Sequence, residues 1–430
     1  MQRPRGAQSN VHRQRNANNM NTKKQIPRWR PQATSNNGDV RGKDRPQKLL
    51  FVDILNYTTM FFRTSAAWPT PQAAFRQVQQ FVKAARQSGW TLELFIDDRI
   101  QTTETEAKWR KRREKEIRMG TRRVPQGANR LLGDMFAHLR VPIHYSHEAD
   151  NDDTIVAHAF ARSAAILSAD RDMYRYTGIS PPLRVFESYS VVRTAYPPTL
   201  ELFERPPSDR NSRSSPRAVL VPPPATNSTM QADWGQIKEG IIYERGSPSP
   251  LTRHFGNLHL TVRPLRQAVY HRLRITGTVH EIIPEWDELK GTVRWTDDHV
   301  EPDPGLAHLL DGAPSDAIAY LFPDLADASP GQCAAAHKDI PPKLMYNHLW
   351  AIRAVVYELL VIASRDKRRS LLNLMEDDPL FPSGQRGERG GWGGGGGTRG
   401  RGGGRGGGKE GGRWRDRSQQ GHQEGKATNS

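Results

Sequence analysis

Short apolar runs and helically spaced apolar residues alternate along the chain from residue 48 onward. "KLLFVDIL" (48–55) and "TLELFID" (91–97) are apolar runs of the length typical of buried strands. Between them, apolar residues recur at helical spacing after Thr70-Pro71, which is a favourable start for a helix. This first part of the chain is therefore predicted to form a strand, a helix and a second strand.

The same alternation continues to about residue 190. The pattern predicts further helices over 104–123, 128–139 and 152–164, and further strands over 141–146, 164–170 and 183–189. Strands that alternate with helices favour a parallel sheet with helices on both faces. We expect an α/β fold with a PIN-like, largely parallel sheet flanked by helices, followed by a smaller mixed C-terminal region.

Composition divides the chain into five segments. Low apolar content predicts a disordered basic tail at 1–47, and the α/β domain is expected over 48–200. Pro and Ser are frequent over 201–250, which predicts a linker or a long loop. A second ordered region is expected over 251–376, and a disordered Gly/Arg-rich tail over 383–430.

The positive charge of the chain belongs to its two ends. Residues 1–48 hold twelve Lys and Arg against two acids, and residues 384–430 hold ten against four. The middle of the chain keeps 41 basic and 40 acidic residues and is nearly neutral. This charge distribution predicts that the tails, rather than the folded part, are attracted to polyanions.

The single cysteine, Cys333, excludes a disulfide framework and fits a reducing compartment. The N-terminal segment lacks both the apolar core of a secretory signal and the amphipathic face of a transit peptide. No apolar stretch reaches the length of about 18 residues that a membrane helix needs. We therefore expect an intracellular protein, in the cytoplasm or the nucleus, without membrane association.

Four predicted strands each end in acidic residues. They are Asp53, Asp97 with Asp98, Glu148 with Asp150, and Asp170 with Asp172. The carboxyl ends of parallel strands meet at one edge of a sheet, and residues two apart on extended chain face the same side. The sequence thus predicts a cluster of carboxylates at this edge.

Such a cluster repels itself unless cations neutralise it. Mg²⁺ and Mn²⁺ prefer carboxylate and water oxygens, and a pair of such ions about 4 Å apart can promote phosphodiester cleavage. For any single acid a structural role competes. Asp152 and Asp153 in particular suit a helix cap or first turn. His144, His147 and His158 match no zinc motif and are expected to be core or surface residues.

The order of these segments resembles the PIN-like nuclease domain of the flap endonuclease/XPG superfamily. The resemblance covers about residues 48–190 and rests on "LFVDIL", "LELFID", a basic helix, "VPIHYSHEAD" and "AAILSADRD". No helix–hairpin–helix segment follows, and "RPLRQAVYHRL" with "VHEIIPEWD" resembles the asteroid-type branch instead. The resemblance implies that the metal-binding and catalytic residues are Asp53, Asp97, Glu148, Asp150, Asp170 and Asp172.

Two basic segments are candidate contacts for nucleic acid. In the superfamily, the position of 105–116 is occupied by an arch or gateway, which implies that Lys108, Arg110, Lys111, Arg112 and Arg113 contact the substrate backbone. A solvated helix with Glu104–Lys108 pairing is the alternative. The C-terminal tail interleaves Arg with Trp, as RNA-binding RGG segments do. Its candidate residues are Arg399, Arg401, Arg405, Arg413, Trp414 and Arg415.

We therefore expect a Mg²⁺- or Mn²⁺-dependent nuclease acting on single-stranded or structured nucleic acid, with RNA favoured and DNA possible. Residues 251–376 are a possible site for a protein partner. The alternative is a non-catalytic RNA-binding or translation-regulatory scaffold that keeps the PIN-like fold. A nuclease requires the acids to converge on an accessible edge, whereas a scaffold tolerates their dispersal.

Overall fold

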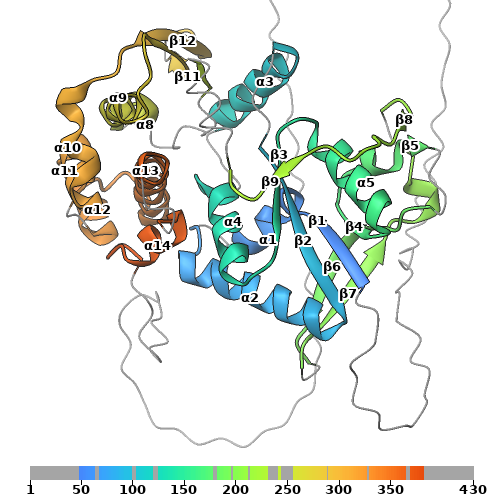
Figure 1. Cartoon of the computed structure of the whole chain (residues 1–430). Coiled ribbons are helices and arrows are strands. Elements are labelled where there is room, and N and C mark those ends of the chain that lie inside the picture. The colour runs from blue at the N-terminus through green and yellow to red at the C-terminus, as the bar shows by residue number, and fades with distance from the viewer. Residues whose placement is uncertain are drawn as a thin grey trace, which may run out of the picture. The chain divides into compact units, whose positions relative to one another are not determined.

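A seven-stranded sheet forms the centre of the first half of the chain in the computed structural model (Figure 1). Its strands lie in the order β7-β6-β4-β1-β2-β3-β9. Their bounds are β1 Lys48–Asp53, β2 Trp90–Asp97, β3 Ile143–Ser146, β4 Ala165–Leu167, β6 Val185–Val192, β7 Thr199–Glu204 and β9 Thr226–Asn227.

The structure describes most of the chain between residues 48 and 381. The described ranges are 48–62, 67–98, 103–119, 124–177, 182–194, 197–211, 214–230, 241–243, 255–287, 289–326, 329–364 and 369–381. All of them belong to one compact unit. The expected tails at 1–47 and 383–430 lie outside the described residues.

The inner strands of the sheet are parallel. β1 pairs with β2 and with β4, β2 pairs with β3, and β4 pairs with β6, all in parallel. Only the outer strands β7 and β9 run antiparallel to their neighbours. The expectation of a largely parallel sheet is thus confirmed. Its parallel core brings the ends of β1, β2, β3 and β4 to one edge.

Helices cover both faces of the sheet, as the alternation of side chains requires. The first helices after β1 are η1 (Ile54–Tyr57), α1 (Thr58–Phe62) and α2 (Pro71–Gln87). Leu50 and Val52 of β1 pack in the core that α2 and α4 (Ala128–His138) cover. Phe51 points the other way, into the core under α5 (Asn151–Arg162).

Local signals set the ends of α2. The Thr70 hydroxyl accepts a hydrogen bond from the Ala73 amide at 3.2 Å, and Pro71 occupies the first helical position. Beyond the helix, Gly89 has a φ of 77°, a left-handed conformation that glycine adopts without strain. β2 follows at once at Trp90. The predicted start at Thr70-Pro71 is therefore confirmed.

The second half of the chain adds a small sheet and a group of helices. β10 (Ile241–Tyr243) pairs in parallel with β11 (Val279–Asp287), which pairs in an antiparallel hairpin with β12 (Thr292–Val300). The helices are α8 Leu258–Thr261, α9 Arg263–Arg272, α10 His308–Asp311, α11 Pro314–Leu321, α12 Pro330–Ala336, α13 Pro342–Ala363 and α14 Leu371–Glu376. Short helices η2 (Arg171–Tyr174), η3 (Pro207–Asp209) and η4 (Pro304–Leu306) lie in the connections.

The segment 201–250, expected as a linker or a long loop, also contributes strands. Its residues Thr226–Asn227 form β9 at the edge of the main sheet. Its residues Arg217–Ala218 form β8, which pairs with β5 (Tyr176–Thr177). This segment is therefore partly built into the α/β fold. Among the described helices, none combines the length and the apolar character required to cross a bilayer.

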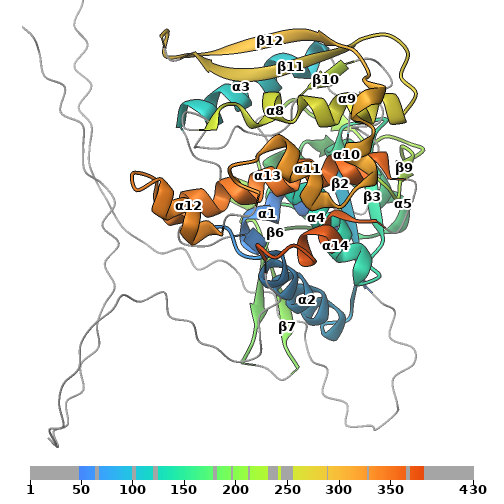
Figure 2. The same ribbon diagram turned by 90° about the vertical axis from the view of Figure 1, so that its left-hand side faces the viewer.

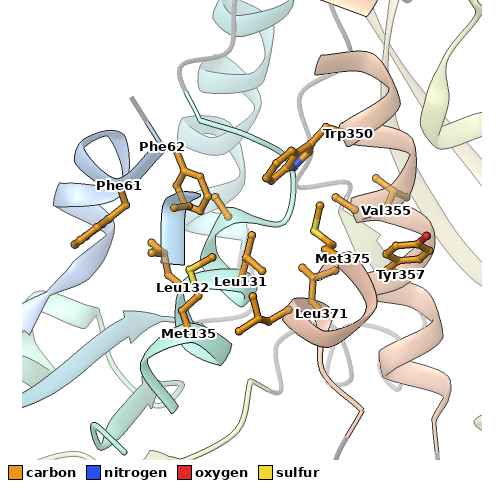
Figure 3. Close-up of a cluster of buried hydrophobic side chains, with 14 of the residues drawn as sticks. Phe61, Phe62, Leu131, Leu132, Met135, Trp350, Val355, Tyr357, Leu371 and Met375 are labelled. Atoms are coloured by element: carbon orange, nitrogen blue, oxygen red, sulfur yellow. The ribbon is translucent and has the colours of Figure 1, made fainter. Parts of the chain in front are cut away.

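One buried cluster joins the sheet region to the C-terminal helices (Figure 3). Trp350 of α13 is 0 % exposed and lies among the rings of Phe62, Trp68 and Phe381, with centroids 6.5, 6.2 and 4.9 Å away. Its indole N–H donates to the Gln126 carbonyl at 3.3 Å. The close-up also shows Leu131, Leu132 and Met135 of α4 facing Leu371 and Met375 of α14. The two halves of the chain therefore share one hydrophobic core.

A buried ion network holds the small sheet on α9. Glu281 of β11 is 0 % exposed and accepts hydrogen bonds from Arg263, Arg266 and Tyr270 of α9, at 2.7 to 2.8 Å. Burial opposes ionisation of Glu281, but the Arg266 charge and these hydrogen bonds outweigh it and lower its pKa. The network fixes the β11–β12 hairpin against the rest of the C-terminal region.

We expect Trp350→Ala to lower the free energy of unfolding by about 3–5 kcal/mol, because it empties a fully buried aromatic site. Chemical denaturation followed by circular dichroism measures this loss. Tyr320→Ala is the matched control, since Tyr320 is 53 % exposed and its truncation should change stability by less than about 1 kcal/mol. Equal effects of the two substitutions would contradict the shared core.

Candidate functional site

The carboxyl group of Asp53 lies at the end of β1 and is 5 % exposed. Its Oδ2 atom accepts hydrogen bonds from the Asn56 amide and from the Ser168 hydroxyl at 3.0 Å, and its Oδ1 atom accepts one from the Asn151 amide at 3.3 Å. Burial raises the pKa of Asp53 to about 7, and the negative charges of Asp170 and Asp97 add to the rise. This carboxyl is therefore poised between its two protonation states near neutral pH.

Asp152, in the first turn of α5, is a second carboxyl with a raised pKa. Burial raises the pKa of Asp152 to about 8, with further contributions from Asp150, Asp53 and Asp170, while Arg175 acts in the opposite direction. The charges of Asp150, Asp53 and Asp170 thus act on Asp152, as those of Asp170 and Asp97 act on Asp53. The structure therefore brings together Asp53, Asp97, Asp150, Asp152 and Asp170, which we call the acidic edge.

Backbone structure places two of these acids. Asp150 is the N-cap of α5, and its Oδ1 atom accepts from the Asp152 amide at 3.0 Å. Asp170 is the N-cap of η2, and its Oδ1 atom accepts from the Asp172 amide at 2.9 Å. Both helices thus begin at the same edge of the sheet. Capping and clustering are compatible roles here, because each carboxylate has a second oxygen.

Two of the predicted ligands take other partners. Glu148 is exposed, and its Oε2 atom accepts from the Ala225 amide at 3.1 Å, next to β9. The Oδ2 atom of Asp172 accepts from the Ser214 hydroxyl at 2.8 Å and lies 3.8 Å from Arg175 Nη1. Neither is among the main causes of the raised pKa of Asp53 or Asp152. Asp172 nevertheless shares the Arg175 guanidinium with Asp152, whose Oδ2 atom lies 4.0 Å from Arg175 Nη2.

The neighbouring acids Asp98 and Asp153 are buried and paired. Asp98 lies 3.4 Å from His147 Nδ1. Asp153 accepts a hydrogen bond from the Tyr176 hydroxyl at 2.7 Å and pairs with Arg217 at 2.8 Å. Their interactions stabilise the fold around the site. The interpretation of Asp153 as a first-turn acid of a helix is confirmed.

The histidines of this region make structural contacts. His144 Nε2 lies 2.9 Å from Glu93 Oε2, and its ring stacks on Phe95 at 4.7 Å. His158 Nε2 donates to the Pro224 carbonyl at 2.8 Å. These contacts agree with the expectation of core or surface histidines.

The donors at the acidic edge suit a hard divalent cation. They are carboxylate oxygens, with amide and hydroxyl groups around Asp53, and such all-oxygen sets favour Mg²⁺ or Mn²⁺ over softer metals. Within the described residues, no group of three His, Cys, Asp or Glu side chains is arranged to hold a metal ion directly. Mg²⁺ sites commonly use only one or two carboxylates and complete the shell with water. The residues at the edge thus fit this kind of site.

Helix α3 (Thr103–Met119) begins five residues after Asp98 and carries a cationic stripe. At 100° per residue, its five exposed cations fall within about 120° of one face. They are Lys108, Lys111, Arg112, Lys115 and Arg118. Among the side chains that the structure describes, no acid forms an ion pair with any of these five cations.

Helix α3 lies beside the β11–β12 hairpin (Figures 1 and 2). Trp295 Nε1 of β12 donates to Glu114 at 3.1 Å, and the Arg110 guanidinium lies 4.9 Å from the Trp295 ring. Arg110 Nε also donates to Glu106 at 2.7 Å. Of the predicted backbone contacts, Lys108, Lys111 and Arg112 therefore lie on the exposed stripe. Arg110 and the half-buried Arg113 do not.

Sequence reasoning missed three residues of these two features. Asp152 was interpreted only as a helix cap or first-turn acid; it does lie in the first turn of α5, but an acid there can also face the edge from which that helix starts. Lys115 and Arg118 continue the i, i+3, i+4, i+7 spacing of Lys108, Lys111 and Arg112. The spacing of cations around the helix could have found them. The six candidate residues of the C-terminal tail, 399–415, lie outside the described residues.

Comparison with known proteins adds no relative. No family model, curated protein or solved structure matches the chain. The chemistry of the acidic edge and of α3 therefore carries the functional argument.

The raised pKa values predict a loss of stability with rising pH in the absence of divalent cations. Asp53 and Asp152 keep their protons in the folded state up to about pH 7 and 8, whereas the unfolded chain releases them near 3.8. The folded state thus binds more protons between these limits, and its stability falls as pH rises through this window. The ionisation of Asp53 alone lowers the free energy of unfolding by up to about 4 kcal/mol across this window. Urea denaturation of wild type and of Asp53→Asn/Asp152→Asn between about pH 5 and about pH 8 measures the difference.

The double variant should lose the part of the pH dependence that these two groups cause. Mg²⁺ at about pH 8 should restore stability to the wild type and not to the variant, since binding to the ionised form offsets the cost. Asp324→Asn, an exposed acid away from the edge, is the control. Parallel pH curves for wild type and double variant would show that these carboxyls do not titrate as described.

Proposed function

We propose that this protein is a divalent-cation-dependent nuclease that acts on single-stranded or structured nucleic acid. The observation that carries the proposal is the acidic edge, where burial raises the pKa of Asp53 to about 7 and that of Asp152 to about 8, and neighbouring carboxylates add to both rises. A fold maintains such a repulsive arrangement at a cost in stability. A bound cation would remove this cost, which is why the arrangement supports a metal site.

The residues of the edge have distinct roles under this proposal. Asp53 and Asp152 would hold Mg²⁺ or Mn²⁺ with water completing the shell, and Asp97, Asp150 and Asp170 would add negative charge around the ion. Asn56, Ser168 and Asn151 fix the orientation of the Asp53 carboxylate through the hydrogen bonds described above. When bound, the cation would supply charge stabilisation at the phosphoryl group and activation of water.

The cationic stripe of α3 supplies the complementary part. Its five side chains extend over eleven residues, or about 15 Å of helix, which is long enough to contact several successive phosphates. The helix begins just after the acidic edge in sequence. Under the proposal, the stripe binds the strand through its backbone, and its contacts do not depend on base sequence.

We expect the full chain with Mn²⁺ to cleave labelled single-stranded RNA, with single-stranded DNA and a flap DNA run in parallel. Asp53→Asn and Asp152→Asn should each lower the initial rate by at least about a hundredfold, because each removes a charge that the cation requires. Asp324→Asn should keep the wild-type rate. Gel analysis of the labelled products measures the cleavage.

Two further variants distinguish the ligand set that the structure brings together from the one that the sequence resemblance implies. Glu148→Gln and Asp172→Asn alter predicted ligands whose carboxylates have other partners. If they reduce cleavage as strongly as Asp53→Asn does, the ligand set is the one that the family resemblance implies. If wild type cleaves none of the three substrates yet binds them, the proposal fails in favour of the non-catalytic RNA-binding scaffold.

We expect the triple variant Lys108→Gln/Lys111→Gln/Lys115→Gln to bind single-stranded RNA more weakly and with less salt dependence. Each lost phosphate contact lowers the slope of log K against log salt by about 0.7, so the slope should fall by about 2. Fluorescence anisotropy over a salt series measures it. Lys83→Gln/Lys290→Gln/Lys343→Gln removes the same charge from exposed sites elsewhere and should leave more of the slope intact. Equal slopes for the two triple variants would rule out the stripe as the contact.

A further inference from the structure

A concave site lies between the first helices and the β6–β7 hairpin. It is a pocket of about 310 Å³ lined by α1, α2 and β6. Its side chains combine apolar, aromatic, amide and cationic groups, from Met60, Phe61, Gln77, Gln80, Phe81, Tyr189, Ser190, Val191 and Arg193. A pocket of this size with a few polar groups is typical of a site for a small, flat, partly polar ligand.

The pocket has an aromatic wall. The Tyr189 ring is half-buried and packs against Phe81 with centroids 4.6 Å apart and against Tyr57 at 5.5 Å. Both neighbours are buried and hold the ring in place. A tyrosine fixed in this way at the wall of a pocket is a ready stacking surface for a planar group.

Amide groups line the same pocket. Gln77 Oε1 accepts from Arg193 Nη2 at 3.1 Å, which orients the Gln77 amide N–H₂ as a donor. Gln80 Oε1 is buried, and within the described part of the chain it accepts no hydrogen bond. An unsatisfied buried acceptor costs about 1–3 kcal/mol. A rotation about its soft terminal torsion turns this oxygen toward the pocket, where a ligand N–H would satisfy it.

One side chain links this pocket to the acidic edge. Tyr57 lies four residues after Asp53, and the charge of Asp53 contributes to the raised pKa of Tyr57 after the larger effect of burial. The other side of Tyr57 contacts Tyr189. The pocket therefore begins one ring away from the carboxylates. A ligand that spans both sites must carry a phosphate and, close to it, a planar group with hydrogen-bonding edges.

We propose that this pocket binds a nucleobase of the substrate strand close to the phosphate at the acidic edge. Tyr189 stacks on the base, and the Gln77 and Gln80 amides, one donor and one acceptor, select among base edges. Arg193 contacts a neighbouring phosphate. The inference rests on the proposed function, since the strand that it places in the pocket is the substrate of the proposed nuclease. It adds base selectivity to a site whose other proposed contacts involve only the backbone of the strand.

The test measures binding separately from cleavage. Full-length protein carrying Asp53→Asn is titrated against four fluorescent single-stranded RNA homopolymers of equal length, and the dissociation constants are compared. We expect the best base to bind at least about fivefold more tightly than the worst, and Gln80→Leu to reduce this ratio to below about twofold. Gln79→Leu, an exposed neighbour on α2 outside the pocket, should keep the ratio.

Tyr189→Leu tests the stacking surface. Its removal should weaken binding of all four homopolymers by about fivefold or more, since stacking does not depend strongly on the base. Circular dichroism of each variant checks the fold, and Gln80→Leu keeps the test decisive if Tyr189→Leu is unstable. Equal affinities for the four homopolymers, or an unchanged ratio in Gln80→Leu, would overturn the inference. If wild type cleaves no substrate but the base preference in binding is observed, the proposed function fails and the assignment of the pocket as a base-binding site stands.

Discussion

The burial of α13 is the constraint on which the arrangement of the rest depends. This helix is enclosed along most of its length, with Trp350 inserted between aromatic side chains that precede α2 and that follow α14. A second polar contact locks the same helix, since the Trp68 amide donates to Asn347 Oδ1 at 2.9 Å. Trp68 and Asn347 are 279 residues apart in sequence. The α/β sheet and the C-terminal helices therefore cannot order their shared core independently.

That constraint extends to the cationic stripe of α3 through a series of packed elements. α13 packs against α9, α9 holds Glu281 of β11, and β12 contacts α3 through Trp295. Glu281 is the rigid step in this series, because Arg266, its main partner, is itself buried and a buried charge without its partner is strongly unfavourable. The C-terminal region, which has no described carboxylate at the acidic edge, thus fixes the orientation of the basic helix. The cationic stripe of α3 and the core contacts of α13 are therefore linked by packing.

Sequence patterns found the elements well and the side-chain roles only in part. β1, α2, β2 and α5 lie where apolar spacing, Thr70-Pro71 and the acidic first turn predicted them, because these signals are local. The same local interpretation gave Asp152 a role only as a helix cap or first-turn acid, although α5 starts at the edge that the strand ends were predicted to share. Glu148 and Asp172 show the converse: their position after strands was predicted, but Ala225 and Ser214, which bind them, come from a Pro/Ser-rich segment whose path no local pattern specifies. The side on which α3 packs depends on Trp295, almost two hundred residues away, and was equally inaccessible to the sequence.

The repelling carboxyls of the acidic edge include one on the strand that is held most firmly in the sheet, and this placement has a physical consequence. β1 is the central strand, paired on both sides, and Asp53 is its last residue. A carboxylate at this point cannot move away from its neighbours to relieve repulsion, and three hydrogen bonds hold it further. Relief must then come from a proton or from a cation, and only the cation leaves the charge available for chemistry at neutral pH. Rigidity of the strand keeps these acids together, since on a flexible loop the same residues would separate and the part of each pKa rise that neighbouring charges cause would be lost.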